Sequence, residues 1–409
     1  MFFIMKLLTY LENIFYTIKR KREDSRFDKG IKKGLIRQAK ICSPDKIGEK
    51  ISIFKPYTKE YFVFPRTFGF ISNGGIEIEY PEVALWKFSN VMIRNNSDVI
   101  ITSDNKAIWA KYFYYNYSKN ITQDEGCIRV EEDTLSYYLP TEIKEVDCAF
   151  SMIGVFADIW AHNIAEYYPK LAVLKNAIEN ANRKIKVLVP EYKDLQVRQI
   201  IYEALSSYDV DVMIVHNGEA VKVNTLYYIE RPTRFTDHET SVVPGDMAIP
   251  KAVCDYIKNN LVIPRSQNIK EDVKYSKLFL IRRGGFGKGI VNYEEIESFF
   301  ERQGFVLVEP HKYTLEEKIT MFKSAEIIVG PSGSAFTNMI FCKPGTKVLV
   351  FSNYQRIFDM YKCIWLQHFG IKAIYVTGRD DKSSKNMTHC SYYIPKDKVI
   401  GAAKELGII

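Results

Sequence analysis

The chain has 409 residues, of which 46% are hydrophobic and 26% are charged, and its formal net charge is +8. This length exceeds the roughly 250–300 residues at which a single core stops growing, so we expect two domains. The composition excludes disordered, collagen-like and low-complexity proteins. No run reaches the ~20 apolar residues of a membrane-spanning helix.

The positive charge is concentrated in the first 40 residues, which carry a net +7 and leave +1 for the remaining 369. Apolar residues recur there at helical spacing between Ile4 and Ile18, and the basic run 19–22 follows at once. This pattern favours an amphipathic helix, residues 1–22, on an anionic membrane surface. The alternative is a helix packed on the protein's own body. The remaining 369 residues are nearly neutral. This argues against a nucleic-acid-binding protein, whose folded domain would normally carry a basic stripe.

The pattern along the chain changes from strands to alternating strands and helices. Residues 50–150 are predicted to be β-rich, because β-branched and aromatic runs alternate with turn residues, and residues 151–175 are predicted to form a long helix. Further strands are expected at 183–190, 210–216, 277–283, 305–310, 326–330 and 346–351. Further helices are expected at 194–205, 250–261, 292–304, 314–325, 331–341 and 395–406, with a polar linker at 263–276.

Strands that alternate with helices indicate parallel sheets. We therefore predict an α/β protein with an N-terminal extension, residues 1–45, and two domains, residues 46–265 and 266–409. Ligands of open parallel sheets bind beyond the carboxyl ends of the strands. The loops that follow the predicted strands are accordingly the places to look for a site.

One such loop is the glycine turn in EIIVGPSGSAFTNMIF. A glycine turn between a strand and a helix presents backbone N–H groups and the positive end of a helix, which bind phosphate. Side-chain donors follow in the same turn. The residues that could contact a phosphate are Ser332, Gly333, Ser334, Thr337 and Asn338. The alternative is an ordinary strand-to-helix turn.

A second loop, in FLIRRGGFGKGIVN, adds positive charge. Alternation places Arg282 and Arg283 on opposite sides of the strand, so one of them should face the cleft. Together with Lys288, that arginine suits a diphosphate. The loop matches neither a P-loop nor a dinucleotide fingerprint. The alternative is a flexible basic loop.

Asp158, His162 and Glu166 are spaced four apart in the predicted helix and fall on the face opposite its apolar stripe. A histidine and a carboxylate on a cleft wall could take a proton from a hydroxyl nucleophile. The alternative is a solvated polar face. Pro169 should end or kink this helix.

No metal or cofactor motif is evident. Seven cysteines include no CxxC pair, and no HExxH or GxSxG occurs. The acidic pair Asp209 and Asp211 is explained by alternation at the start of a strand. We therefore expect no metal site and no cofactor other than the substrate.

Residues 282–351 resemble glycosyltransferase family 61, and weaker likeness extends over roughly 75–405. The family pattern falls on Arg283, on Lys288 to Asn292, on Glu316 and Glu317, on Gly330 to Asn338, and on His162, Glu166 and Pro169. Three positions depart from the usual pattern. Ser332 stands where the family usually has His, Lys288 where it has Arg, and Tyr293 where an acid follows the Asn.

The resemblance implies a GT-B fold, two Rossmann-like domains that face a cleft, and an inverting, metal-independent enzyme. His162 or Glu166 would be the base. The donor, most commonly a UDP-sugar, would contact Arg283, Lys288, Asn292, Glu317 and the turn Ser332, Gly333, Ser334, Thr337 and Asn338.

The expected activity is transfer of a sugar from a nucleotide-sugar to a hydroxyl of a growing surface or capsular glycan, which can be lipid-linked. The expected location is the cytoplasmic face of the membrane, without a nucleic-acid partner. The alternative is a non-catalytic sugar-nucleotide-binding or scaffold subunit of a polysaccharide assembly complex, which the serine at 332 suggests.

Overall fold

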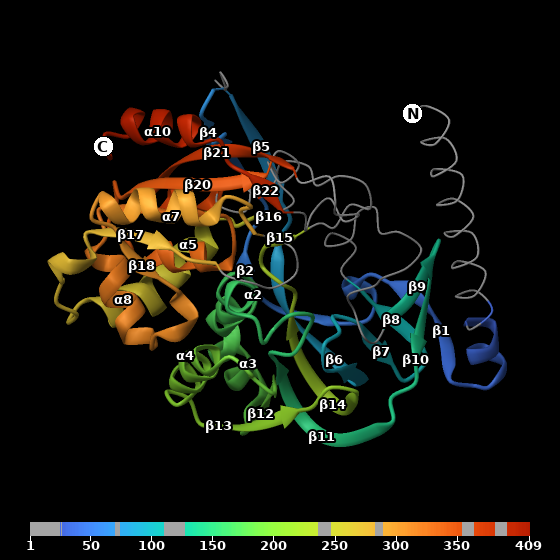
Figure 1. The fold of residues 1–409 in the computed structure, drawn as a ribbon. Helices are drawn as coiled ribbons and strands as arrows, with labels where there is room; N and C mark the ends of the chain where they lie inside the picture. The colour runs from blue at the N-terminus through green and yellow to red at the C-terminus, as the bar shows by residue number, and fades with distance from the viewer. Residues whose placement is uncertain are drawn as a thin grey trace, which may run out of the picture.

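The computed structural model describes residues 25, 27–69, 74–109, 127–235, 247–282, 289–353, 364–380 and 391–409. The amphipathic helix predicted over residues 1–22 lies outside this range. Two large sheets flanked by helices form the molecule, which confirms the predicted α/β class (Figure 1). In the described part of the chain, no helix is long and apolar enough to cross a membrane.

The first sheet joins eleven of the described strands and confirms the β-rich character predicted for residues 50–150. Its path is β13-β12-β11-β14-β6-β7-β8-β1-β10-β9, with β2 beside β6. The strands are β1 (Ile36–Cys42), β2 (Glu49–Lys55), β6 (Val83–Arg94), β7 (Ile100–Thr102), β8 (Lys106–Ile108), β9 (Cys127–Glu131), β10 (Thr134–Tyr138), β11 (Glu142–Ser151), β12 (Ile185–Pro190), β13 (Val210–Val215) and β14 (Glu219–Ile229).

Four of these strands are parallel, in the order β13-β12-β11-β14. The chain moves outward from β11 to β13 through the helices α3 (Leu174–Ala181) and α4 (Leu195–Leu205). It then returns to the other side of β11 as β14. The order therefore reverses between β11 and β14, and ligands of such sheets bind beyond the strand ends at a reversal.

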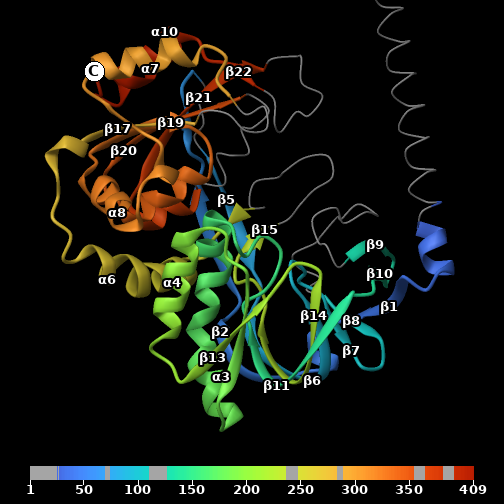
Figure 2. The same cartoon turned by 60° about the horizontal axis from the view of Figure 1, so that its bottom comes forward.

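The second sheet has five parallel strands in the order β18-β17-β19-β20-β21, which reverses between β17 and β19. Helices α7 and α10 cover one face and α8 the other (Figure 2). The strands are β17 (Lys277–Leu280), β18 (Val306–Val308), β19 (Ile327–Pro331), β20 (Lys347–Asn353), β21 (Lys372–Asp380) and the antiparallel β22 (Tyr392–Tyr393). The helices are α7 (Tyr293–Arg302), α8 (Leu315–Ser324) and α10 (Lys396–Glu405).

Alternation along the strands of the second sheet divides its side chains between two cores. Phe279 packs under α7 and α10, whereas Leu278 and Leu280 belong to a cluster that also contains Phe150 of the first sheet. Burial of large apolar side chains is the main stabilising contribution to such a core. The two sheets therefore share one hydrophobic cluster.

A segment of the first half of the chain reaches the second sheet. The strands β3 (Thr58–Val63) and β5 (Gly75–Tyr80) form a separate hairpin, and β4 (Arg66–Thr67), between them in sequence, pairs with β21. Arg66 also forms an ion pair with Glu405 of α10, at 2.7 Å. The predicted division at residue 265 does not anticipate this crossing.

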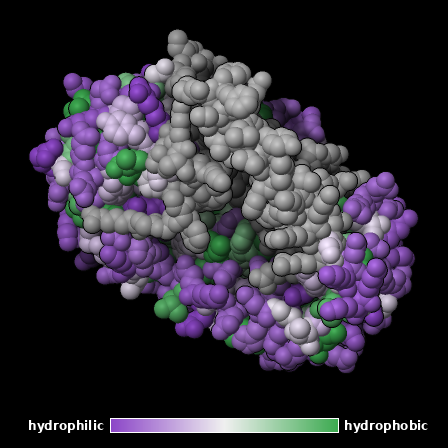
Figure 3. Space-filling model, turned by 45° about the vertical axis from the view of Figure 1, so that its right-hand side comes forward, coloured by the Kyte–Doolittle hydropathy of each residue, from purple (hydrophilic) through white to green (hydrophobic). Residues whose placement is uncertain are grey.

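The remaining elements connect the halves. They are β15 (Arg234–Phe235), β16 (Met247–Ala248), α5 (Lys251–Ile257) and α6 (Ile263–Ser266), so the predicted linker begins with a helical turn. The face seen in Figure 3 is mostly hydrophilic, and a recess near its centre exposes a few hydrophobic residues.

Candidate functional site

The segment after β11 forms the first wall of the site, and it differs from the predicted long helix. β11 continues to Ser151, and the helix α2 (Trp160–His162) begins only at Trp160. The residues between them form turns, in which Phe156 has a φ of 64° that no right-handed helix contains. The prediction that Asp158 shares a helical face with His162 and Glu166 is therefore wrong.

A π-helical turn, Asn163–Tyr167, follows α2, and a 3-10 turn, Tyr168–Val173, follows the π turn. Pro169 has no N–H, so it cannot donate to the carbonyl of residue 165, and the winding changes from π to 3-10 beside it, at Tyr168. This change of winding confirms the break predicted at Pro169. Isolated π turns often occur at functional sites.

The π turn brings His162 and Glu166 together, with Glu166 Oε1 against His162 Nδ1. An ionised carboxylate can only accept, so Nδ1 carries the proton and Nε2 keeps a lone pair. The Glu166 side chain is completely buried, while 26% of the His162 side chain is exposed. Only His162 can therefore meet a substrate, and the alternative of a solvated polar face does not hold for Glu166.

Arg231, two residues after β14, donates from Nη1 to Glu166 Oε2. Its Nη2 lies 3.1 Å from Asp98 Oδ2, and both side chains are buried. Burial alone would raise the pKa of Glu166, but Arg231 and then His162 outweigh it and hold that pKa below its ordinary value. The residues that follow the neighbouring strands β11 and β14 thus form one charged network.

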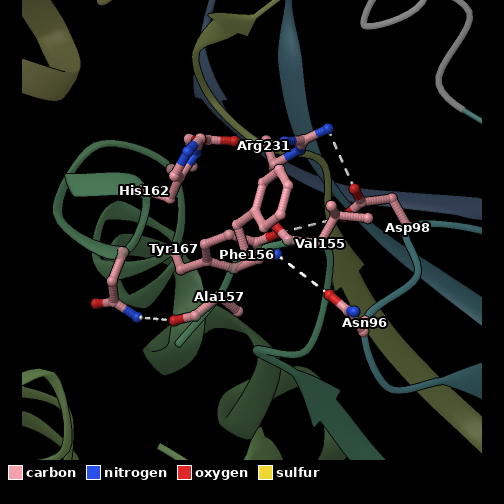
Figure 4. A network of polar contacts seen from close by, with 10 residues as sticks. Asn96, Asp98, Val155, Phe156, Ala157, His162, Tyr167 and Arg231 are labelled. Atoms are coloured by element: carbon pink, nitrogen blue, oxygen red, sulfur yellow. Dashed lines mark hydrogen bonds and ion pairs between the residues drawn. The ribbon is translucent and has the colours of Figure 1, made fainter. Parts of the chain in front are cut away.

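Neutral hydrogen bonds fix the loop around this network (Figure 4). The Tyr167 hydroxyl donates to the Val155 carbonyl at 2.7 Å, and Asn163 Nδ2 donates to the Ala157 carbonyl at the same distance. In Figure 4, Arg231 lies between His162 and Asp98. The imidazole is thus held by a rigid shell, as precise proton transfer requires.

Two further charges lie beside the network. Lys170 is fully buried, and its ammonium lies 4.9 and 5.2 Å from the ring centroids of Tyr167 and Tyr228. Burial lowers the pKa of Lys170 to about 8, although Asp98 opposes the shift. Burial likewise raises the pKa of Glu230 to about 7, opposed by Lys170. Perturbed groups gathered around one histidine are typical of catalytic sites.

A cavity of about 850 Å³ lies between the carboxyl ends of the two sheets, a volume that suits a nucleotide-sized ligand. From the first half, its lining includes Trp160 and residues 193–196. From the second half, its lining includes Arg282, residues 310–316, Lys318 and part of the glycine turn. Trp160 lies two residues before His162, so the helix of the candidate base also borders this cavity.

Arg282 lines the cavity, whereas Arg283, the other arginine that the sequence offered, lies outside the described residues. Arg282 Nη1 donates to the Ser332 carbonyl at 2.8 Å. A Cβ on Gly333 would come within 2.4 Å of the same nitrogen, so only glycine lets the guanidinium lie against this turn. The Arg282 guanidinium and the start of the helical turn Ser334–Phe341 therefore lie together where the strand order reverses, between β17 and β19.

The predicted donor residues divide into two groups. Gly333, Ser334 and Asn338 line the cavity. Ser332 and Thr337 are buried, and the Ser332 N–H donates to the Phe351 carbonyl at 2.7 Å.

Two other predicted residues have structural partners. The Asn292 amide donates to the Ile394 carbonyl at 2.8 Å and accepts from the Ile394 N–H at 3.0 Å. Glu317 forms a capping box with Thr314 at the start of α8. Neither residue lines the cavity, and their predicted contacts with a donor stay predictions.

Arg283 and Lys288 lie outside the described residues. The acidic pair Asp209 and Asp211 contacts Lys184, at 3.2 and 2.9 Å, as expected for exposed strand residues. Among the described residues, no group of three His, Cys, Asp or Glu side chains could hold a metal ion.

Sequence reasoning missed Asp98, Arg231 and Lys318. Arg231 follows β14, which pairs with β11, and Asp98 follows β6, which pairs with the other edge of β14. Only the tertiary fold brings these strand ends together, so spacing along the chain gave no signal. Lys318 was read only as part of an amphipathic helix, although a lysine within the buried face of such a pattern is itself a signal.

Residues 160–349 match the family model described as Glycosyltransferase 61, which confirms the resemblance seen in the sequence. The matched range contains His162, Glu166, Arg231 and the cavity-lining residues, while Asp98 precedes it. No curated protein matches the chain.

Proposed function

We propose that this chain is a family 61 glycosyltransferase that transfers a hexose or pentose from a UDP-sugar to a hydroxyl of a growing surface or capsular glycan. The match of residues 160–349 to the family model supports the proposal. The observation that carries the proposal is the exposed His162, held by buried Glu166 and Arg231, on a helix that borders the cavity. The GT-B arrangement belongs to the same proposal, supported by the two parallel sheets that meet at this cavity.

The proposed reaction is one inverting displacement. The acceptor hydroxyl oxygen forms a bond to the anomeric carbon while the bond from that carbon to the diphosphate oxygen breaks. His162 Nε2 takes the hydroxyl proton, and Glu166 stabilises the resulting imidazolium through Nδ1–H. The departing UDP keeps the bonding electron pair.

Positively charged and N–H groups of this chain would stabilise the negative charge that develops on the departing diphosphate. Arg282 and the start of the helical turn Ser334–Phe341 would contact the diphosphate. Arg283 and Lys288 are proposed to contribute as well. No step in this scheme requires a metal ion.

The test is UDP release by the purified full-length chain across a panel of UDP-sugars, with and without EDTA. We expect one donor to be turned over, with or without EDTA. His162→Ala and Glu166→Ala should each abolish most of that turnover. If both variants kept full turnover, the base assignment would be wrong, and loss of activity in EDTA would contradict the metal-independent scheme.

The non-catalytic reading remains the second candidate because Ser332 occupies the position where the family usually has His. The Ser332 carbonyl accepts from Arg282, and the Ser332 N–H donates to the Phe351 carbonyl. The residue itself is buried. A scaffold subunit would bind UDP without turning over any donor. Restoring the family residue with Ser332→His would then be expected to leave the protein inactive.

We also propose that residues 1–22 hold the enzyme at the cytoplasmic face of the membrane, where a lipid-linked acceptor would be available. The support is the basic run 19–22 after an apolar helical pattern. Flotation with phosphatidylserine vesicles should be lost when these four residues become Gln. Binding that is unchanged would favour a helix packed on the protein's own body.

A further inference from the structure

Lys318 is a buried cation that faces the cavity, and no described residue is a polar partner for it. It lies on α8, only 5% of it is exposed, and it forms part of the cavity lining. Its ammonium lies over the Trp160 ring, 5.1 Å from the ring centroid. Within the described part of the chain, no hydrogen-bond acceptor or ion pair accompanies that contact. Three N–H donors are therefore available at the cavity wall.

The nearest acidic residue does not complete this site. Asp194 caps α4, where its Oδ1 accepts from the N–H groups of Gln196 and Val197 at 2.9 and 3.2 Å. Burial lowers the pKa of Lys318 to about 8, and the charge of Asp194 opposes the shift. Lys318 is thus still protonated at neutral pH. A buried ammonium in this state is strongly stabilised by an anion.

Lys318 reaches the cavity from a different element than the residues of the proposed diphosphate site. Arg282 and Gly333 lie at the ends of β17 and β19. The ammonium of Lys318 instead lies over the ring of Trp160, which belongs to the helix that carries His162. In a single displacement the transferred sugar lies between the base and the diphosphate. Lys318 is therefore placed beside the sugar.

We propose that Lys318 forms a subsite for a carboxylate on the transferred sugar, so that the preferred donor carries a hexuronic acid. This inference rests on the proposed function in one respect, because it takes the cavity to be the donor site. The exposed Lys175 of α3, which is not among the residues that line the cavity, provides a matched control, since it has the same charge without the burial.

The test titrates D-glucuronate and D-glucose into the full-length wild type, Lys318→Met and Lys175→Met, and follows tryptophan fluorescence. Trp160→Phe identifies the part of the signal that comes from Trp160. We expect Lys318→Met to bind glucuronate at least about tenfold more weakly, the effect of losing one charged hydrogen bond. Lys175→Met should resemble wild type, and glucose should not distinguish the variants. Equal glucuronate affinity in wild type and Lys318→Met would overturn the proposal.

Two further measurements separate the possible causes. UDP and inorganic pyrophosphate should bind wild type and Lys318→Met equally, and an equal loss of UDP and glucuronate would overturn the proposal by assigning Lys318 to the diphosphate. Wild-type affinity for glucuronate should fall as pH rises through about 8, and a flat profile between about pH 6 and 9 would also overturn it. If glucuronate distinguishes the variants but UDP binds none of them, the donor function fails and the carboxylate subsite stands.

Discussion

Glu166 keeps its negative charge inside the protein because the Arg231 guanidinium and the Nδ1–H of His162 contact its two oxygens. His162 occupies one oxygen and Arg231 the other. The carboxylate then fixes the proton of His162 on Nδ1 and leaves Nε2 to act as a base. The chemistry at one exposed atom thus depends on charges that never meet the substrate.

Replacing Glu166 with Gln tests this dependence directly. The amide keeps the shape but not the charge, so the imidazole loses its orientation and the imidazolium its stabilisation. We expect turnover of the UDP-sugar donor to fall about a hundredfold or more, with little change in UDP affinity. The matched control is Glu191→Gln, which alters the exposed pair that Glu191 forms with His216 at 3.2 Å. Equal turnover in Glu166→Gln and wild type would contradict the assignment.

Arg231→Gln tests the origin of the low pKa of Glu166. Without the guanidinium, burial dominates and raises the pKa of Glu166, so a higher pH is needed to ionise the carboxylate. The acidic limb of the kcat/KM profile should therefore move upward by about one pH unit or more. Arg183→Gln, at an exposed arginine, should leave the profile unmoved. A merely structural role for Arg231 would reduce activity without moving the limb.

At the scale of elements, the sequence predicted most strands and helices, because hydrophobic patterns and turn residues act over a few neighbouring residues. Short apolar runs identified β12 and β20, and the helix predicted from residue 194 matches α4, which Asp194 caps. The helix predicted from residue 151 failed because β11 extends into it and Phe156 adopts a left-handed conformation. Apolar side chains that pack in a loop can imitate a helical stripe.

The start of α8 shows how a motif can serve the fold rather than the ligand. Glu317 accepts from the Thr314 N–H at 2.8 Å and completes a capping box. Glu317→Ala should therefore reduce the free energy of unfolding by about 1 kcal/mol and leave the KM for the donor unchanged. Thr314→Ala should cost a similar amount, and the double variant less than the sum. A raised KM at unchanged stability would instead support the donor contact implied by the family resemblance.

At the scale of the molecule, the sequence predicted two α/β units and a cleft because each unit has its own strand and helix pattern. It did not predict β4, because a two-residue strand has no periodicity. Nor could it place Asp98 beside Arg231, since that contact depends on how β6, β14 and β11 are arranged in the first sheet. The candidate site thus combines residues that only the tertiary fold brings together.

The shared core leads to a prediction about unfolding. Leu280 of β17 packs in the cluster that contains Phe150 of β11, and β4 adds a pairing across the same boundary. We therefore expect one cooperative transition, in which amide hydrogen exchange reports the same global opening free energy for β12 and β19. Leu280→Ala should lower both values together, by about 2–5 kcal/mol.

Val399→Ala provides the control, because Val399 lies in the separate core beneath α10. In a single cooperative unit, this substitution also lowers the protection of β12, although Val399 does not belong to the cluster that the two sheets share. Two independent domains would behave differently, since Val399→Ala would then lower protection in β19 and leave β12 unchanged. That outcome would show that the shared cluster and β4 do not couple the halves, and the two sheets could then move relative to each other around the bound donor.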